Sequence, residues 1–342
     1  MNLRTLFLTL FLAGAGGCSR ADVPQSAAPP ASAPQAAAQT TEQKAEAEWQ
    51  KLKALYKYDA AAPLDAKLVR SSDNIVASFA RWTIRGAQGA TVPLYLIKPS
   101  GASAAKPLPA VVVLHGKDQK IEDMTPIGVL LASRGYIAII PEIDGHGERR
   151  DAKNLLFNGD SKRLRDGLLE TVQDVRRTLD FAATRPEIDA NRIGVLGVSL
   201  GAILGSMATA VDERLKTAVF IVGGADWQII LRESQENFAR GMRAGGETDE
   251  AAKKWRVLDD VDPQFFMAHI APRAALFINA KRDGIIPQAS ADKFFANARE
   301  PKKQILFDSG HVVDPNLVAP PALEWLETNL KKVPQAATVA LR

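Results

Sequence analysis

Short, continuously apolar runs recur along most of this chain, and they constrain its fold more than any other feature. They are AVVVLH (110–115), YIAII (136–140), RIGVLGV (192–198), TAVFIV (217–222), AALFIN (274–279) and QILF (304–307). Strands that are apolar at successive positions are covered on both faces, as in a parallel sheet with helices on each side. Longer helix-like stretches separate them, near 123–134, 162–184, 199–211, 288–298 and 316–331. The pattern predicts an α/β fold with a mostly parallel, doubly wound sheet.

Two kinds of segment precede the first run. Residues 75–85 and 91–97 are rich in strand formers and flank a Gly-Ala-Gln-Gly turn, so they predict an antiparallel hairpin at the sheet edge. Residues 42–58 contain strong helix formers with large apolar residues on one stripe, which predicts a leading helix docked on the core. No repeat of fixed period is visible, which argues against solenoids and propellers.

One long interval interrupts the alternation, between the runs 217–222 and 274–279. An insertion from Gly224 to Ile270 (224–270) contains helix-like pieces at 227–242 and 247–258, with Gly245-Gly246 between them. Insertions of this length usually form a cap, so we expect a helical cap over the carboxyl end of the sheet. Its candidates for an apolar underside are Trp227, Phe238, Met242, Trp255, Phe265 and Phe266, of which we expect two or three to contact substrate. Its candidates for a substrate carboxylate are Arg232, Arg240 and Arg243.

The first residues resemble an export signal. A basic residue, the apolar run Leu6–Ala15, two glycines and Cys18 follow one another, so residues 1–17 are predicted to be a signal peptide. The run is too short to span a bilayer comfortably as a helix. Ala15-Gly16-Gly17-Cys18 resembles a bacterial lipobox, with Ala15 in place of the usual leucine, and predicts lipidation of Cys18, the only cysteine. A chance cysteine beside an ordinary cleavage site is the alternative.

Residues 18–41 are mostly Ala, Pro, Gln and Ser and are predicted to be a disordered tether. The folded domain is then 42–342. Together these segments predict a protein exported from a bacterial cytoplasm, either periplasmic or anchored to a membrane as a lipoprotein.

Charge and histidine content exclude other classes of protein. The net charge of +4 comes from interspersed basic and acidic residues with no basic cluster among aromatics, so we expect no nucleic-acid partner. The four histidines show no metal-ligand spacing, so neither a metal nor another cofactor is expected. A length of 342 residues suits a single large domain. The oligomeric state stays open.

Gly197-Val198-Ser199-Leu200-Gly201 matches the G-x-S-x-G motif between an apolar strand and a predicted helix. In a nucleophile elbow this sharp turn places the serine in strained backbone geometry, and small flanking residues let the neighbouring segments approach. The motif therefore predicts Ser199 as a nucleophile. The alternative is an ordinary helix N-cap.

Such a serine needs a base and an acid, which follow it in the order Ser, Asp or Glu, His. His311 follows the last strand, on a loop before the last helix, whereas His115, His146 and His269 all come earlier. We therefore expect His311 to be the general base. The acid is expected to be Asp283, directly after the run 274–279, and Asp226 after the preceding run is the alternative.

The early strand ends in His115-Gly116-Lys117-Asp118. A loop in this position donates one oxyanion-hole N–H, and the residue after the nucleophile donates the other. We expect these donors to be the backbone N–H groups of Lys117 and Leu200. The residues predicted to contact substrate are Trp227, Phe238 and His115.

From about residue 75 to 331 the chain resembles the α/β-hydrolase superfamily, and especially its dienelactone-hydrolase and acetyl-xylan-esterase-like branch. The residues that carry the resemblance are His115-Gly116, Asp144 to Arg149, Gly197 to Gly201, Asp283 to Pro287 and Gly310-His311. The dienelactone enzymes usually carry a cysteine nucleophile, so Ser199 indicates the esterase-like members.

The resemblance implies hydrolysis of a small-molecule ester through an acyl-enzyme on Ser199. Alternatives within enzymes are a thioesterase or a peptidase of the prolyl-oligopeptidase type. An alternative of another class is a catalytically inactive lipoprotein that uses the fold for binding. The fold and triad leave the natural substrate open.

Overall fold

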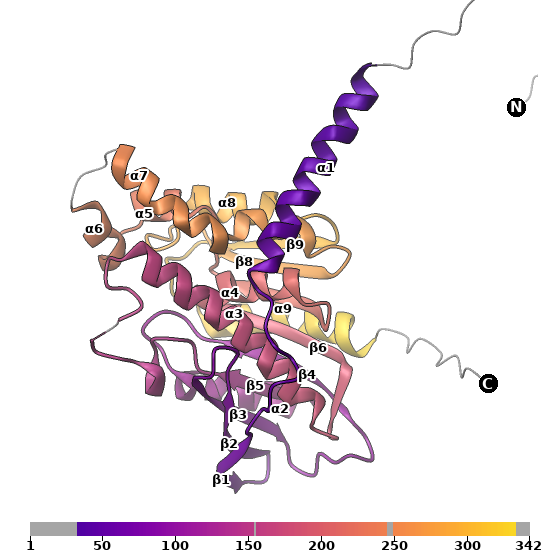
Figure 1. Cartoon of the computed structure of the whole chain (residues 1–342). Helices are drawn as coiled ribbons and strands as arrows, with labels where there is room; N and C mark the ends of the chain where they lie inside the picture. Colours follow the sequence, from indigo (N-terminus) through magenta and orange to yellow (C-terminus); the bar gives the residue numbers. More distant parts are fainter. Residues whose placement is uncertain (1–32, 154, 245–248, 333–342) are drawn as a thin grey trace, which may run out of the picture. The chain divides into compact units, whose positions relative to one another are not determined.

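A computed structural model describes residues 33–153, 155–244 and 249–332. The chain divides into two compact units, Met1–Glu46 and Ala47–Arg342, and the sheet lies within the second. Its strands are β1 (Lys67–Asp73), β2 (Ala77–Arg85), β3 (Thr91–Pro99), β4 (Leu108–Leu114), β5 (Ile137–Pro141), β6 (Ile188–Val198), β7 (Leu215–Ile221), β8 (Ala274–Ala280) and β9 (Lys302–Phe307). The helices are α1 (Ala33–Ala54), α2 (Thr125–Ser133), α3 (Ser161–Ala183), α4 (Leu200–Val211), α5 (Trp227–Glu233), α6 (Asn237–Arg243), α7 (Asp249–Trp255), α8 (Gln288–Ala296) and α9 (Pro315–Leu326) (Figure 1).

The nine strands lie in the order β1-β2-β3-β5-β4-β6-β7-β8-β9. From β5 to β9 all neighbours are parallel, and β1, β2 and β3 are antiparallel to their neighbours. The α/β-hydrolase fold, with its mostly parallel sheet and its hairpin β2–β3, is therefore confirmed. Because the parallel strands all end at the same edge, the loops after β4, β5, β6, β8 and β9 gather there.

Two hydrophobic cores cover the two faces of the sheet, which explains the continuously apolar runs. In β4 the side chains of Ala110, Val112 and Leu114 belong to one core, together with apolar residues of α3, α4 and α8. Val111 and Val113 belong to the other core, with residues of α2 and α9. Every second residue thus points to the opposite face, and both faces exclude water.

The sequence missed strand β1. Its residues, KLVRSSD, are all exposed and pair with β2 at the edge of the sheet. An edge strand with no buried face has no apolar alternation, so it gives no periodic pattern.

Helix α1 begins at Ala33 and not at residue 42 as predicted, so it includes the last part of the predicted tether. That part is rich in Ala and Gln, which favour helix, and its proline lies in the first turn, where a missing N–H costs nothing. The predicted signal peptide 1–17, Cys18 and the tether as far as residue 32 lie outside the described residues. No helix of the described chain is long and apolar enough to cross a membrane.

The described part of the insertion 224–270 contains three short α-helices, α5, α6 and α7, where two helical pieces were predicted. The predicted piece 227–242 is broken between α5 and α6, where Ser234 takes an extended conformation and the carboxylate of Glu236 accepts the N–H of Phe238 at 2.6 Å to begin α6. Short 3₁₀ turns follow α7 as far as His269. The predicted break at Gly245-Gly246 lies outside the described residues.

Candidate active site

Ser199 lies in the turn between β6 and α4 with φ of 54° and ψ of −114°. A positive φ is costly for a residue with a β-carbon, by about 1–3 kcal/mol. Gly197 and Gly201 make the turn possible, because a β-carbon at Gly197 would lie 2.1 Å from the carbonyl oxygen of Gly201, and one at Gly201 would lie 2.2 Å from that of Leu114. The hydroxyl of Ser199 does not cap α4, so the N-cap alternative does not hold.

Three of the predicted side chains form one hydrogen-bonded chain. His311 Nε2 lies 2.9 Å from Ser199 Oγ, and His311 Nδ1 lies 2.7 Å from Asp283 Oδ2. The other carboxylate oxygen of Asp283 accepts the N–H groups of Ile285 and Ile286 at 2.8 and 2.9 Å. A carboxylate that accepts Nδ1–H leaves the lone pair of Nε2 directed at the serine hydroxyl.

Asp226, the alternative acid, has other partners. It occupies the left-handed region with φ of 69°, and its Oδ1 accepts the N–H of Ile229 to cap α5. Its Oδ2 lies 2.5 Å from Lys293 Nζ on α8. The structure therefore brings Asp283, and not Asp226, to His311.

Leu200 and Lys117, whose backbone N–H groups are predicted to form the oxyanion hole, both line the cavity at Ser199. Leu200 is the first residue of α4, and Lys117 follows β4. Within 33–153, 155–244 and 249–332 neither N–H donates to a protein acceptor. The loop lies against the elbow, because a β-carbon at Gly116 would be 3.5 Å from Ser199 Cβ. Both groups are therefore free to donate to a ligand.

His115 is not a substrate-facing residue, and that prediction is wrong. Its side chain is fully buried and does not line the cavity at Ser199. Nδ1 lies 2.9 Å from the carbonyl oxygen of Gly116, and Nε2 lies 2.9 Å from Glu142 Oε1 and accepts the N–H of Ile143 at 3.2 Å. His115 thus ties the loop after β4 to the loop after β5. A run of apolar residues ending in histidine does not reveal which face that histidine occupies.

A cavity of about 520 Å³ opens above Ser199 and His311. Its walls are mainly apolar and include Met124, Ile127, Ile203, Ile221, Ile230 and Val318. The predicted Trp227 and Phe238 line it, so the insertion does cover the elbow. Trp227 also packs the insertion, since it is 3% exposed and its indole N–H donates to the carbonyl oxygen of Val261 at 3.0 Å.

The other named residues of the insertion do not line this cavity. Phe266 and Trp255 are buried in the core, whereas Phe265 is 45% exposed. Arg243 donates to the carbonyl oxygens of Leu231 and Ser234 and so stabilises the turn between α5 and α6. Met242, Arg232 and Arg240 are likewise outside the cavity.

Two contacts that fix the cap could not be predicted from the sequence. Lys117 Nζ lies 3.0 Å from Glu236 Oε1 and also pairs with Asp118. Burial alone would lower the pKa of Lys117, but its hydrogen bonds to these carboxylates outweigh it and raise the pKa. Asp262 is buried and accepts the N–H groups of Asp226 and Trp227 at 2.8 and 2.7 Å. The partners are far apart in sequence, so no local pattern links them.

The described residues contain no group of three or more His, Cys, Asp or Glu side chains arranged to hold a metal ion.

Comparison with known proteins places this chain among hydrolases. A Bacillus subtilis protein named "Putative esterase YitV" is 23% identical over 69% of this chain and 94% of its own. An Escherichia coli protein named "Putative carboxymethylenebutenolidase" is 31% identical over 47% of this chain and 58% of its own. Among solved structures, an acetyl xylan esterase from Paenibacillus sp. R4 has a TM-score of 0.69 at 22% identity, covering 82% of this chain and 93% of its own.

Residues 92–306 match the Dienelactone hydrolase family, and this range is more than half of the chain. It contains β4 to β8, the elbow and Asp283. The chain therefore belongs to the dienelactone hydrolase family.

Proposed function

We propose that this protein is a serine carboxylic-ester hydrolase with Ser199 as nucleophile, His311 as general base and Asp283 as the acid that orients the histidine. The observation that carries the proposal is the continuous chain from Asp283 Oδ2 through His311 to Ser199 Oγ, with separations of 2.7 and 2.9 Å. The strained turn at Ser199 presents its hydroxyl to the apolar cavity, where an ester can bind.

In the first half of the reaction Ser199 Oγ forms a bond to the ester carbonyl carbon and His311 Nε2 takes its proton. The carbonyl electron pair moves to the oxygen, where the N–H groups of Leu200 and Lys117 stabilise the negative charge. The intermediate then collapses, the bond from carbon to the alcohol oxygen breaks, and His311 returns the proton to that oxygen. An acyl-enzyme on Ser199 remains.

Water completes the cycle by the same route. His311 removes a proton from a water molecule while the water oxygen bonds to the acyl carbon, and the resulting oxyanion occupies the same two N–H groups. Collapse breaks the bond to Ser199 Oγ, which regains its proton from His311. Asp283 keeps the histidine in one tautomer and stabilises its positive charge in both halves.

The relatives support ester hydrolysis without specifying the substrate. YitV is named as an esterase, and the solved structures with the same fold include acetyl xylan esterases. Thioesterases and peptidases of the prolyl-oligopeptidase type would use the same acyl-enzyme chemistry, so substrate panels separate them. An inactive binding lipoprotein would have no use for the hydrogen-bonded chain at Ser199.

The proposal predicts that Ser199→Ala lowers kcat on p-nitrophenyl acetate or butyrate by at least about 10³-fold, because the nucleophile is lost. The variant should also fail to react with a fluorophosphonate probe that labels the unaltered protein. Ser133→Ala, an exposed serine on α2, is the matched control and should retain full activity. A folded Ser199→Ala protein that keeps a tenth of the activity would show that another residue attacks the ester.

A further inference from the structure

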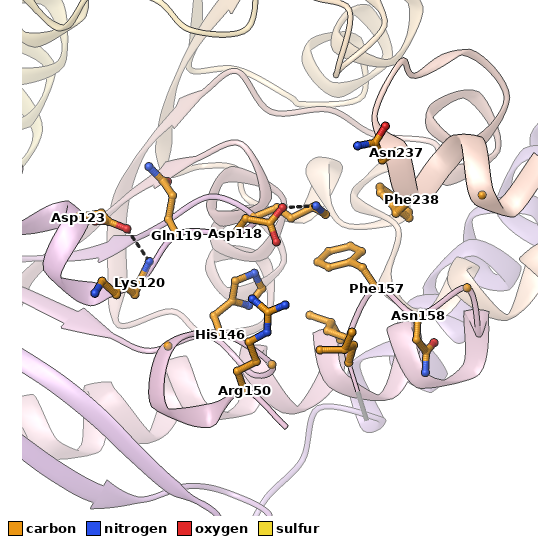
Figure 2. A pocket seen from close by; sticks show the side chains of 17 residues that line it. Asp118, Gln119, Lys120, Asp123, His146, Arg150, Phe157, Asn158, Asn237 and Phe238 are labelled. Carbon is orange, nitrogen blue, oxygen red and sulfur yellow. Dashed lines mark hydrogen bonds and ion pairs between the residues drawn. The ribbon is translucent and has the colours of Figure 1, made fainter. Parts of the chain in front are cut away.

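Lys117 lies in a loop that has a cavity on either side. It lines the cavity at Ser199, and it also lines a second cavity of about 710 Å³ that adjoins the first. Phe157 and Phe238, whose rings lie 4.8 Å apart, line both cavities and mark the boundary between them (Figure 2). Close packing holds a segment only where other atoms surround it. The position of the Lys117 N–H therefore depends on the polar contacts of this loop.

The residues on either side of Lys117 have their contacts mainly within the loop. The N–H of Gly116 donates to Gln119 Oε1 at 2.8 Å, and the N–H of Gln119 donates to the carbonyl oxygen of Gly116 at 3.3 Å. Asp118, whose side chain is 70% exposed, pairs with Lys117 Nζ (Figure 2). Within the described chain, Glu236 is the only residue outside the loop that hydrogen-bonds to Lys117, with 3.0 Å between Oε1 and Nζ. Glu236 thus ties Lys117 to the rest of the protein.

The carboxylate of Glu236 is itself held firmly. Its Oε2 accepts the N–H of Phe238 at 2.6 Å at the start of α6, which leaves Oε1 for Lys117. The backbone N–H of Glu236 donates to Ser234 Oγ at 3.1 Å, and Arg243 donates to the carbonyl oxygen of Ser234 at 2.8 Å. Since both carboxylate oxygens and the backbone of the turn are bonded, Glu236 presents a fixed partner to Lys117.

The turn that carries Glu236 is also bonded to the loop of the acid. The N–H of Gln235 donates to the carbonyl oxygen of Gly284 at 2.7 Å, and Gly284 directly follows Asp283. A β-carbon at Gly284 would lie 2.8 Å from Gln235 Oε1, so the two segments are in close contact. The turn 234–236 therefore connects the loop of the acid to the loop that provides the predicted oxyanion donor.

We propose that Glu236 is a positioning residue for the oxyanion hole, which holds the backbone N–H of Lys117 toward the carbonyl oxygen of the bound ester. This inference rests on the proposed function, in which that N–H stabilises the oxyanion. A direct effect of the Glu236 charge would have the opposite sign, because a carboxylate near a developing oxyanion destabilises it. Loss of this carboxylate should therefore lower kcat if it positions the loop, and raise kcat if only its charge matters.

Glu236→Gln tests the positioning role, because the amide oxygen can still accept the N–H of Phe238 while the charge that holds Lys117 is lost. Removing a whole oxyanion-hole donor costs about 10² to 10³-fold in kcat. A donor that is displaced but still present should cost less, so we expect kcat on p-nitrophenyl butyrate to fall about tenfold and KM to stay within about twofold. An unchanged or higher kcat in the folded variant would overturn the proposal.

A thionoester shows whether the loss occurs at the oxyanion hole. In p-nitrophenyl thionobutyrate sulfur replaces the carbonyl oxygen, and sulfur is a weak acceptor of N–H groups. The unaltered protein should therefore hydrolyse the oxygen ester faster, and Glu236→Gln should reduce the ratio of the two kcat/KM values by about tenfold. Equal losses on both substrates would show that Glu236 does not act through the oxyanion hole.

The other partner of the ion pair provides a second test. Lys117→Met, Glu236→Gln and the double variant should each lower kcat by a similar factor, because all three break the same contact. Charge alone would shift the two single variants in opposite directions, and independent roles would make their losses multiply; either result would overturn the proposal. Glu233→Gln, an exposed carboxylate at the end of α5, is the matched control and should leave kcat unchanged.

Magnetic resonance of the protein with isotope-labelled lysine separates this inference from the proposed function, because it requires no hydrolysis. The signal of the Lys117 N–H is identified by its absence in Lys117→Met. We expect its order parameter to fall from about 0.85 to below about 0.6 in Glu236→Gln and to stay unchanged in Glu233→Gln. If the order parameter falls in a protein that hydrolyses no ester, Glu236 holds the loop and only the proposed catalysis fails. If the protein hydrolyses esters but neither the order parameter nor kcat changes in Glu236→Gln, Glu236 does not position Lys117.

Discussion

An aspartate at the carboxyl end of a strand can orient a histidine only if one of its oxygens is left for the imidazole. Asp283 meets this condition, because the N–H groups of Ile285 and Ile286 occupy Oδ1 and leave Oδ2 for His311. Asp226 uses Oδ1 to cap α5 and Oδ2 to bind Lys293. Both aspartates follow a strand of the sheet, and the groups that hydrogen-bond to their carboxylate oxygens distinguish them.

These contacts predict opposite effects of two matched substitutions. Asp283→Asn should lower kcat by on the order of 10³ to 10⁴-fold, because an amide can donate to Nδ1 and so stabilise the wrong tautomer of His311. Asp226→Asn should leave kcat within about twofold and cost less than about 1 kcal/mol of stability, because the amide oxygen can still cap α5 while only a partly exposed ion pair is lost. Esterase assays and thermal unfolding of both variants check this. The acid would be Asp226 if the effects on kcat were reversed.

Some residues of the site could be predicted from the sequence and others could not. Ser199 and His311 could be predicted because a local motif and the order along the chain restrict them, and Asp283 because it follows a strand. Glu236 and Asp262 give no such pattern, since their partners Lys117 and Asp226 are distant in sequence. The position of His115 at the end of a strand could be predicted from the sequence. The direction of its side chain could not, because successive residues of a strand point to opposite faces of the sheet.

At the level of elements, the insertion 224–270 combines two roles that its sequence does not separate. Trp227 is 3% exposed and bonded to Val261, so it anchors the insertion as well as lining the cavity. Phe238, on α6, is only partly buried and contacts Phe157 at the boundary between the cavities. Both are aromatic residues on predicted helices, and only the packing around each distinguishes them.

Replacing each ring with alanine should separate these roles. Trp227→Ala should destabilise the protein by about 3–5 kcal/mol, because it leaves a cavity and removes a buried hydrogen bond. Phe238→Ala should cost less stability and should shift the relative kcat/KM for acetyl, butyryl and octanoyl esters. Phe265→Ala, with a 45% exposed ring outside the cavity, is the control for both. An equal loss for all three esters in Phe238→Ala, together with a lower Tm, would assign Phe238 to packing alone.

At the level of the whole molecule, the site exists because strands distant in sequence end at one edge. Residues 199, 283 and 311 follow β6, β8 and β9, and parallel pairing from β6 through β9 aligns their carboxyl ends. The apolar runs predicted these strands, but they carry no information on neighbours, because every buried strand is equally apolar. The position of β5 between β3 and β4 could not be predicted from the sequence for the same reason.

The cellular location of the protein depends on the residues at its N-terminus. The apolar run ending in Gly16-Gly17-Cys18 predicts export and acylation of Cys18, and these residues lie outside the described structure. One acyl chain holds a protein only weakly at a membrane, so stable anchoring requires the multiple chains of a lipoprotein cysteine. Mass spectrometry of detergent-extracted protein should show an acylated N-terminal Cys18, and Cys18→Ala should move esterase activity into the soluble fraction without changing kcat. An unmodified mature N-terminus beyond residue 18, with activity already soluble in the unaltered protein, would rule out the anchor.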